Sequence, residues 1–249
     1  MFRAPLLAAA LALTALPAAA FDASSMTDAE REAFRAEIRA YLLDNPEVLM
    51  EAISVLEERQ AAEQAQGDVA LVAAHADALF NDGYSYVGGN PEGDITIVEF
   101  MDYRCGYCKK AFPEVESLIE GDGNIRFIVK EFPILGEQSV VASRFAIATL
   151  QVAGPEAYKA VHDAMMQQRG EFNEASLRSL AEQAGTDPEP ILAAMESDEV
   201  SAVIAENHAL AQAMQITGTP TFVLDDQMLR GYVPLQAMMG IVDEVRGSK

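Results

Sequence analysis

The stretch from Ile95 to Pro113 constrains the fold more than any other, because it joins a strand pattern to a helix pattern at two cysteines. The run Ile95–Met101 is apolar and β-rich, which is typical of a buried strand. Cys105 and Cys108 follow at the spacing Cys-x-x-Cys, where a helix is expected to begin. The free N–H groups and positive dipole end of a helix stabilise an anion at its first residue, which lowers the pKa of a thiol there. The pair is therefore a candidate for redox catalysis.

Composition excludes several other classes of function. The chain has 249 residues, of which half are hydrophobic, and this is enough for a sizeable core. Its 17 Lys and Arg face 39 Asp and Glu, and a net charge of −22 makes nucleic acid an unexpected partner. Cys105 and Cys108 are the only cysteines, so neither a structural disulfide framework nor a four-cysteine zinc site is available.

The first residues have the pattern of an export signal. Arg3 supplies the positive start, Leu6–Leu16 the apolar stretch and Ala18–Ala20 a small-residue cleavage site. We therefore expect residues 1–20 to be a signal peptide, with an uncleaved membrane anchor as the alternative. The apolar stretch is shorter than the ~20 residues that span a bilayer. The style of the signal suggests a bacterial periplasm, an oxidising compartment in which a dithiol makes, breaks or moves disulfides.

Two amphipathic helices are expected after the signal. Thr27 and Glu30 have capping-box spacing, and Asn45–Glu47 is expected to end one helix and cap the next. Their apolar stripes are Phe34, Ile38, Tyr41 and Leu42 in the first helix and Leu49, Ala52, Ile53 and Leu56 in the second. A two-helix unit buries such stripes poorly by itself, so they pack either on the main domain or on other copies of the chain. We favour self-association through residues 27–66, because the polar helical run that follows resembles a spacer.

The next segments predict a parallel βαβ unit. Gly67 is expected to interrupt the helical run, and residues 69–80 resume it. A short strand over 84–87 and a loop over 88–91 precede the strand 95–101. A helix over 105–119, kinked by Pro113, then leads to a strand over 125–130. Two strands joined by a helix at this spacing favour a parallel pair.

The rest of the chain predicts a helical insertion followed by a hairpin. Five helical patterns, over 139–152, 156–168, 173–184, 190–196 and 200–215, are separated by glycine and proline. Strands over 221–224 and 228–232 are expected to form an antiparallel hairpin turned by Asp225 and Asp226. A helix over 235–246 ends the fold.

This order of elements resembles the thioredoxin fold as it occurs in the DsbA family, from Tyr86 to Lys249. The resemblance rests on three motifs, which are Glu99–Cys108, Lys130–Pro133 and Gly218–Thr221. It implies an α/β fold with a helical insertion. We therefore divide the chain into a signal peptide (1–20), a helical oligomerisation segment (21–66), a linker helix (67–85) and a catalytic domain (86–249) with its insertion at about 137–215.

The resemblance also implies roles for the two cysteines and their neighbours. Cys105 is the exposed nucleophile and Cys108 the shielded resolving thiol, with Gly106 and Tyr107 tuning the thiolate. A structural staple is the alternative, but a disulfide closing so short a loop adds little stability. Haem attachment is disfavoured because lysine, not histidine, follows the second cysteine.

Thr219 and Pro220 are the expected substrate-binding residues. By resemblance, the Thr219–Pro220 bond is cis and faces the dithiol, so that the backbone of Thr219 pairs with an extended substrate. An ordinary trans turn is the alternative from sequence alone.

Glu99 is a candidate buried acid, because it lies on the strand that leads to the dithiol. Burial would raise its pKa and let it exchange a proton with Cys108, whereas an ordinary exposed glutamate is the alternative. Lys130 is a candidate charge partner for it. His75, His162 and His208 are each expected to be surface or cap residues. The methionine pairs at 165–166 and 238–239 are expected to fill the core, so no metal site and no cofactor are predicted.

The segment Leu42–Ile53 is similar to the N-terminal segment of ScsC-type proteins, the suppressor-of-copper-sensitivity relatives of DsbA. Some members use it to oligomerise, which brings several dithiols together for disulfide isomerisation. The Cys105–Cys108 tetrapeptide and Thr219 also resemble the DsbC isomerase site, although the DsbC dimerisation domain is missing. We therefore expect a periplasmic disulfide isomerase or reductase acting on exported, cysteine-containing proteins. Its expected membrane redox partner is of the DsbD/ScsB type or the DsbB type. The alternatives are a DsbA-like dithiol oxidase and a copper-binding protein using the same thiols.

Overall fold

The computed structural model describes residues 25–248, so the expected signal peptide lies outside the described residues. The chain divides into two compact units between Arg59 and Gln60. Within residues 25–248, no helix combines the length and apolar character needed to cross a membrane.

The first unit consists of α1 (Asp28–Asp44) and the first part of α2 (Glu47–Ala74). The predicted capping box is present, with the Thr27 side chain accepting from the Glu30 N–H and the Glu30 carboxylate accepting from the Thr27 N–H. As expected, Asn45 ends α1, and its side-chain amide donates to the carbonyl of Tyr41 in that helix. No described residue of α1 is buried. Large apolar side chains of this unit are exposed, including Phe34, Ile38, Tyr41, Leu49, Ile53 and Leu56.

The second unit is built around a five-stranded sheet of order β1-β3-β2-β4-β5. Its strands are β1 (Tyr86–Gly89), β2 (Ile95–Met101), β3 (Ile125–Glu131), β4 (Thr221–Leu224) and β5 (Gln227–Arg230). Strands β2 and β3 are parallel, with Glu99 opposite Val129, and β4 and β5 form the expected antiparallel hairpin. The predicted βαβ unit and hairpin are therefore both confirmed.

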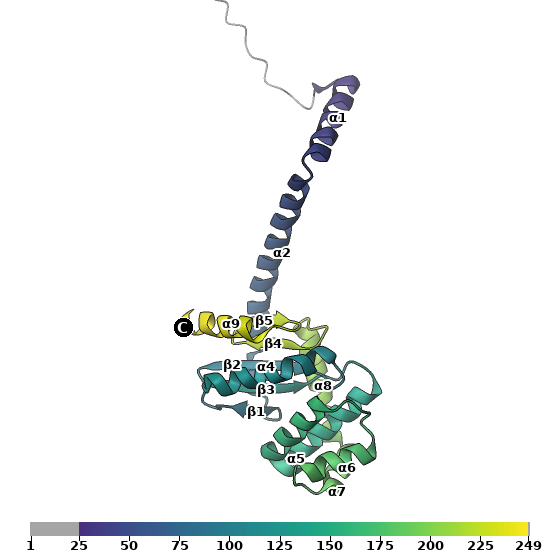
Figure 1. Cartoon of the computed structure of the whole chain (residues 1–249), viewed down its shortest axis with the longest axis vertical. Helices are drawn as coiled ribbons and strands as arrows, with labels where there is room; N and C mark the ends of the chain where they lie inside the picture. The colour runs from purple at the N-terminus through teal and green to yellow at the C-terminus, as the bar shows by residue number, and fades with distance from the viewer. Residues whose placement is uncertain (1–24, 249) are drawn as a thin grey trace, which may run out of the picture. The chain divides into compact units, whose positions relative to one another are not determined.

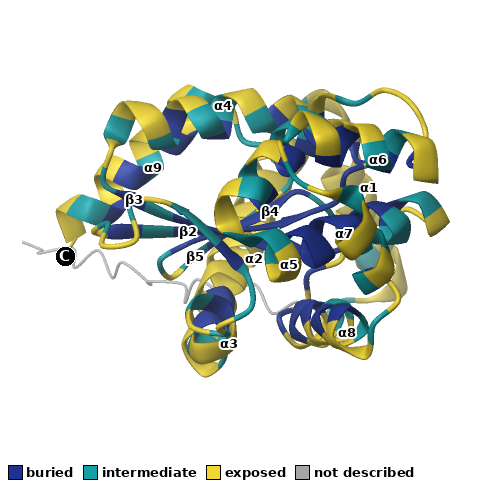
Figure 2. Cartoon of the chain, turned by 90° about the horizontal axis from the view of Figure 1, so that it is seen from below, coloured by how far each residue is buried: buried dark blue, intermediate teal, exposed yellow. Residues whose placement is uncertain are grey.

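Helices cover both faces of this sheet, and Figure 2 shows α4 (Gly106–Asp122) and α9 (Leu235–Ser248) on one side and α3 (Ala76–Phe80) and α8 (Asp198–Ala213) on the other. Side chains alternate between the faces of a strand. Ile97 and Met101 of β2 accordingly belong to the core beneath α4, whereas Val98 and Phe100 belong to the core that contains Leu79 of α3.

The expected helical insertion consists of α5 (Glu137–Gln167), α6 (Glu174–Gln183), α7 (Pro188–Ala194) and α8. Figure 1 shows α5, α6 and α7 grouped at one end of the sheet. Helix α5 is two expected helices joined at Gly154, whose φ of +84° interrupts the helical backbone just before Pro155.

Two local expectations about glycines need correction. Gly67 does not interrupt the N-terminal helix, because α2 continues through it to Ala74. Gly88 and Gly89 belong to β1 rather than to a loop. A Cβ at Gly89 would lie 2.3 Å from the carbonyl oxygen of Ile125, so the close approach of β1 to β3 requires glycine there.

Lys130 is not the charge partner of Glu99. The two residues lie on neighbouring strands at positions of opposite parity, so their side chains leave opposite faces of the sheet. Lys130 is fully buried, donates to the Ala78 carbonyl (2.7 Å) and forms an ion pair with Asp82. This pair joins β3 to the segment that follows α3.

We predict that Lys130→Met lowers the free energy of unfolding by about 3 kcal/mol, because the Asp82 carboxylate is then left buried without its cation. Urea denaturation at neutral pH measures the loss. The double variant Lys130→Met/Asp82→Asn serves as control and should recover part of it. A cost in the single variant below about 1 kcal/mol would contradict a coupled buried pair.

Candidate active site

A tight turn after β2 carries the first cysteine. The buried Asp102 carboxylate accepts from the backbone N–H groups of Arg104 (2.7 Å), Ile134 (2.8 Å) and Leu135 (3.0 Å). The carbonyl of Asp102 accepts from the N–H of Cys105 at 3.0 Å. One side chain therefore fixes both the turn before Cys105 and the loop that follows β3.

Cys105 is the N-cap residue of α4. Its Sγ accepts from the Cys108 N–H at 3.4 Å and lies 3.2 Å from the carbonyl oxygen of Thr219. The pKa of the Cys105 thiol is lowered to about 5. The hydrogen bond from the Cys108 thiol is the largest cause, and bonds from the Thr219 side chain and from two backbone N–H groups add to it against the effect of burial. Expected to be exposed, Cys105 is in fact only 7% accessible.

Cys108 lies one turn into α4 and is fully buried. Burial raises the pKa of its thiol well above the ordinary value, and the hydrogen bond to Cys105 and the nearby Glu99 raise it further. The two thiols are thus inequivalent, since one is readily ionised and the other holds its proton. The structure thus shields Cys108 more than Cys105.

Glu99 lies on β2 with its side chain on the α4 face of the sheet, and it is 3% exposed. Its pKa is raised to about 8, first by burial and then by the negative charges of Cys105, Glu116 and Glu131. Its Oε1 has no hydrogen-bond partner among the described residues. The alternative of an ordinary exposed glutamate is therefore excluded, and the acid lies where it interacts with both thiols.

The Thr219–Pro220 peptide bond is cis, as the resemblance implied. It directly precedes β4, which pairs with β2, and so it reaches the end of the sheet where α4 begins. The carbonyl of Thr219 faces Cys105 Sγ, and the carbonyl of Pro220 accepts from Gly231 at 2.9 Å. The structure therefore brings the two expected substrate-binding residues against the dithiol.

Sequence reasoning missed an aromatic rim beside Gly106 and Tyr107. Tyr107 is 64% exposed and stacks on Tyr232, with ring centroids 6.5 Å apart. Lys110 Nζ lies 3.9 Å from the Tyr232 ring centroid, and the Tyr232 hydroxyl donates to Glu114 at 2.5 Å. Tyr232 was expected to end a strand over 228–232, but β5 ends at Arg230 and the Tyr232 ring packs on α4.

The histidines do not behave alike. His75 is the N-cap residue of α3, as expected of a cap residue, and His208 is partly buried against the Phe132 ring. His162 is a correction, because it is 3% exposed and stacks on Tyr158 inside the insertion. In the part of the chain that the structure describes, no group of three or more His, Cys, Asp or Glu could hold a metal ion.

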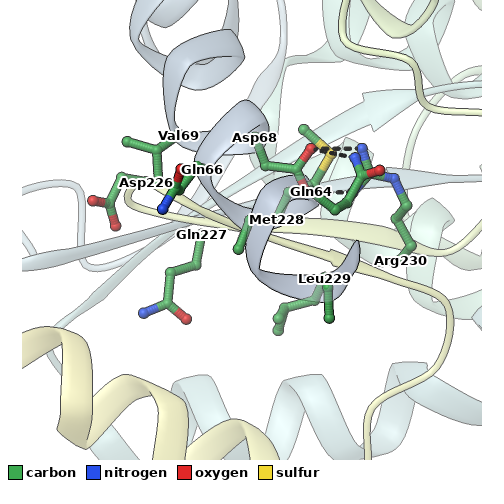
Figure 3. A pocket seen from close by; sticks show the side chains of 11 residues that line it. Gln64, Gln66, Asp68, Val69, Asp226, Gln227, Met228, Leu229 and Arg230 are labelled. Atoms are coloured by element: carbon green, nitrogen blue, oxygen red, sulfur yellow. Dashed lines mark hydrogen bonds and ion pairs between the residues drawn. The ribbon is translucent and has the colours of Figure 1, made fainter. Parts of the chain in front are cut away.

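A pocket of about 650 Å³ lies away from these residues, between the second half of α2 and β5 (Figure 3). Its apolar lining includes Ala65, Val69 and Met228, and Figure 3 shows the ion pair of Asp68 with Arg230 at one side. None of the residues predicted for the site lines it. The pocket therefore adds nothing to the chemistry at Cys105.

Comparison with known families gives two matches in this chain. Residues 96–242 match the DSBA-like thioredoxin domain, and residues 30–63 match the copper resistance protein ScsC N-terminal domain. The first match spans more than half of the chain and contains both cysteines and the cis-proline. The second covers most of α1 and the first part of α2.

Solved structures agree with these matches. A thioredoxin-like oxidoreductase from Silicibacter pomeroyi is 43% identical with a TM-score of 0.64, covering 69% of this chain and 97% of that one. Proteus mirabilis ScsC in a transitional conformation is 29% identical with a TM-score of 0.66, covering 92% of this chain and all of that one.

Curated relatives share only part of their length with the chain. The Na⁺/H⁺ antiporter NhaA 1 of Salinispora arenicola is 27% identical over 158 residues, which are 63% of this chain and 24% of that protein. The chain thus spans about a quarter of that relative. Disulfide bond formation protein D of Bacillus subtilis is 22% identical over 172 residues, which are 64% of this chain and 76% of that protein. With the fold, the two inequivalent thiols and the family match in agreement, this chain belongs to the family of DSBA-like thioredoxin domains and carries an ScsC-type N-terminal segment.

Proposed function

We propose that the protein is a thiol–disulfide oxidoreductase that works through Cys105 and Cys108. One observation carries the proposal: the Cys105 sulfur caps the start of α4 and also lies 3.2 Å from the carbonyl that precedes the cis-proline. The helix end stabilises a thiolate, and the neighbouring extended backbone offers an edge on which a substrate strand can lie.

The proposed exchange conserves electrons at each step. The Cys105 thiolate attacks one sulfur of a substrate disulfide, a mixed disulfide forms, and the other substrate sulfur leaves as a thiolate. Cys108 then loses its proton and attacks Cys105 Sγ, which releases the second substrate thiolate and closes the Cys105–Cys108 disulfide. The reverse sequence oxidises a substrate dithiol.

The second step needs a proton acceptor, because Cys108 is buried and its pKa is raised. Glu99 is the proposed acceptor. Its own pKa of about 8 means that it can release and take up a proton near neutral pH. We assign no cofactor, since the electrons reside on the two sulfurs throughout.

We predict that Cys105 in the reduced protein is alkylated by iodoacetamide with a midpoint near pH 5, since only the thiolate reacts. Cys108→Ala should shift this midpoint upward, because the Cys108 thiol is the first cause of the low pKa of Cys105. Rates measured across pH test both statements, with Cys105→Ser as the blank. A midpoint near the free-cysteine value of about 8.5 in the unmodified protein would refute them.

We predict that Glu99→Gln prolongs the mixed disulfide, because Cys108 then lacks its proton acceptor. With a mixed disulfide formed at Cys105 by a small aromatic disulfide, release of the aromatic thiol reports the attack by Cys108. The release should be about 10²-fold slower or more in the variant, as for loss of a general base. Unchanged release would remove Glu99 from the mechanism.

A stability measurement on the same variant checks the burial of the acid independently. The folded-state pKa of Glu99 lies above its ordinary value of 4.5, so ionising it opposes folding as pH rises from 4.5 to about 8. Glu99→Gln lacks this opposing effect. Its unfolding free energy should match that of the unmodified protein at pH 4 and exceed it progressively at higher pH, by up to about 1.4 kcal/mol per pH unit.

We further propose that the protein acts mainly as a disulfide isomerase or reductase of exported proteins, assembled through residues 27–66. The exposed apolar side chains of α1 and of the first part of α2 support this, because no described residue of α1 is buried within the chain. The match of residues 30–63 to the ScsC N-terminal domain also supports it. The export pattern of residues 1–20 supports a periplasmic location, where a membrane redox partner of the DsbD/ScsB or DsbB type would exchange electrons with the dithiol.

We predict that Ile38→Glu dissociates the assembly and abolishes recovery of activity from ribonuclease with mispaired disulfides. Ile38 is 43% exposed on α1, and a charge there prevents burial of the apolar stripe against another copy. Ala36→Glu is the matched control, because it adds the same charge two positions away, on another face of the same helix. Sedimentation equilibrium gives the mass. A monomeric unmodified protein that rescues no ribonuclease would exclude the isomerase role.

The lowered pKa of Cys105 is the observation that favours the second candidate, a dithiol oxidase. A stabilised thiolate favours the reduced dithiol, and this makes the disulfide form more oxidising. The two roles differ in the state of the dithiol in the cell, since an isomerase is kept reduced and an oxidase is kept oxidised. Alkylation of the protein in acid-quenched cells distinguishes them.

A further inference from the structure

A buried polar cluster lies behind the active-site turn and has no place in the exchange reaction described above. At its centre is Glu131, the last residue of β3, which is 3% exposed. Its Oε1 accepts from the hydroxyls of Tyr103 (2.9 Å) and Tyr158 (2.7 Å), and its Oε2 accepts from Ser143 (2.7 Å). Three hydroxyl groups therefore hydrogen-bond to the Glu131 carboxyl group in place of water. None of these donors carries a positive charge.

The proton positions follow from these contacts. The single hydroxyl proton of Tyr103 is used toward Glu131, so the Tyr103 oxygen can only accept from His162 Nδ1, which lies 2.9 Å away. His162 is neutral, because burial lowers its pKa to about 3. Neutral His162 therefore carries its proton on Nδ1. Burial raises the pKa of Glu131 to about 7, so these directions hold where Glu131 is ionised, and there they orient the Tyr103 ring.

Of the three side chains that donate hydrogen bonds to Glu131, Tyr103 is the one that belongs to the turn carrying Cys105. Ser143 and Tyr158 both lie on α5, in the helical insertion, and Asn207 of α8 donates to the backbone carbonyl of Glu131 at 3.0 Å. Tyr103 is fully buried and lies two residues before Cys105. Tyr103 therefore joins the turn to the insertion through Glu131, in addition to the bonds that Arg104 and Lys109 donate to carbonyl groups of the insertion.

The turn is also held by the hydrogen bonds of Asp102 to Arg104 and to the loop after β3, and by the bond from the Arg104 guanidinium to the Gly170 carbonyl. Small rotations of this turn move the Cys105 sulfur relative to the N–H groups of α4. The bond from the Cys108 N–H to that sulfur has an ordinary length for a sulfur acceptor, 3.4 Å, and such rotation weakens it by turning donor and acceptor out of line.

We propose that Tyr103 and Glu131 are positioning residues of the active site, which hold the turn before Cys105 so that its sulfur stays on the amide groups at the start of α4. This inference rests on the proposed function and deepens it, since it assigns to the helical insertion a role in setting the reactivity of the nucleophile. Neither residue touches the reacting sulfur atoms; each acts through the backbone of residues 103–105.

Two matched substitutions separate positioning from stability. Tyr103→Phe and Tyr158→Phe each remove one hydroxyl that donates to the same oxygen, Glu131 Oε1, from a fully buried ring. Only Tyr103 is in the segment that carries Cys105. If the cluster had only a structural role, both variants would lose thermal stability. The alkylation midpoint of Cys105 would then be unchanged in both.

The experiment measures iodoacetamide alkylation of Cys105 across pH in the reduced full chain, with thermal unfolding recorded in parallel. We expect Tyr103→Phe to raise the alkylation midpoint by about half a pH unit, so that alkylation below the midpoint is about threefold slower. Tyr158→Phe should keep the midpoint of the unmodified protein, whatever its loss of stability. Equal midpoints in the two variants, or a larger shift in Tyr158→Phe, would overturn the proposal.

Substitutions of Glu131 provide the second arm, which stands even if Tyr103→Phe does not fold. Glu131→Met removes the acceptor and should raise the midpoint as Tyr103→Phe does. Glu131→Gln keeps an amide oxygen for the tyrosine hydroxyls and should stay close to the unmodified midpoint. A normal midpoint in Glu131→Met overturns the positioning role. A failure of the proposed function is distinguishable, because the unmodified protein itself would then lack a midpoint near pH 5.

Discussion

The sulfur of Cys105 takes the place of a side-chain cap at the first turn of α4, and the rest of the site is arranged around that contact. The first turn of a helix leaves backbone N–H groups without partners, so an anion there is stabilised by hydrogen bonds and by the helix dipole together. Asp102 fixes the turn that delivers the sulfur, and the cis Thr219–Pro220 loop closes the opposite side. The reactivity of one thiol therefore depends on chain segments that meet only at the carboxyl end of β2.

The alternation of side chains along β2 and β3 decides which buried charges affect that thiol. Glu99 and Glu131 both point to the α4 face, where the charge of Glu131 raises the pKa of Glu99 and Glu99 raises that of Cys108. Lys130 lies between Val129 and Glu131 in the chain but points to the other face, where Asp82 neutralises it. The face of the sheet that carries the chemistry thus keeps two buried carboxyl groups and no buried cation among its described partners. Such an arrangement costs stability and keeps Glu99, whose pKa is raised to about 8, largely protonated at neutral pH.

The N-terminal unit differs from the second unit in how its helices are stabilised. Its helices have regular caps, as at Thr27 and Glu30, yet its large apolar side chains stay exposed within the chain. Helical structure there is encoded locally, by capping and by helix propensity, whereas burial has to come from another surface.

The sequence by itself determined the features that depend on short spacings. Strand, Cys-x-x-Cys and helix follow from the pattern of residues 95–113, and the hairpin at Asp225–Asp226 and the helical insertion follow in the same way. The assignment of Pro220 as cis needed the family resemblance, because most X-Pro bonds are trans. The same resemblance placed Thr219 against Cys105, a contact that spans 114 residues. Only the tertiary structure decided that Lys130 faces away from Glu99 and that His162 is buried behind Tyr103. Spacing along the chain encodes local periodicity and caps, but contacts between distant segments depend on how the sheet and its helices pack.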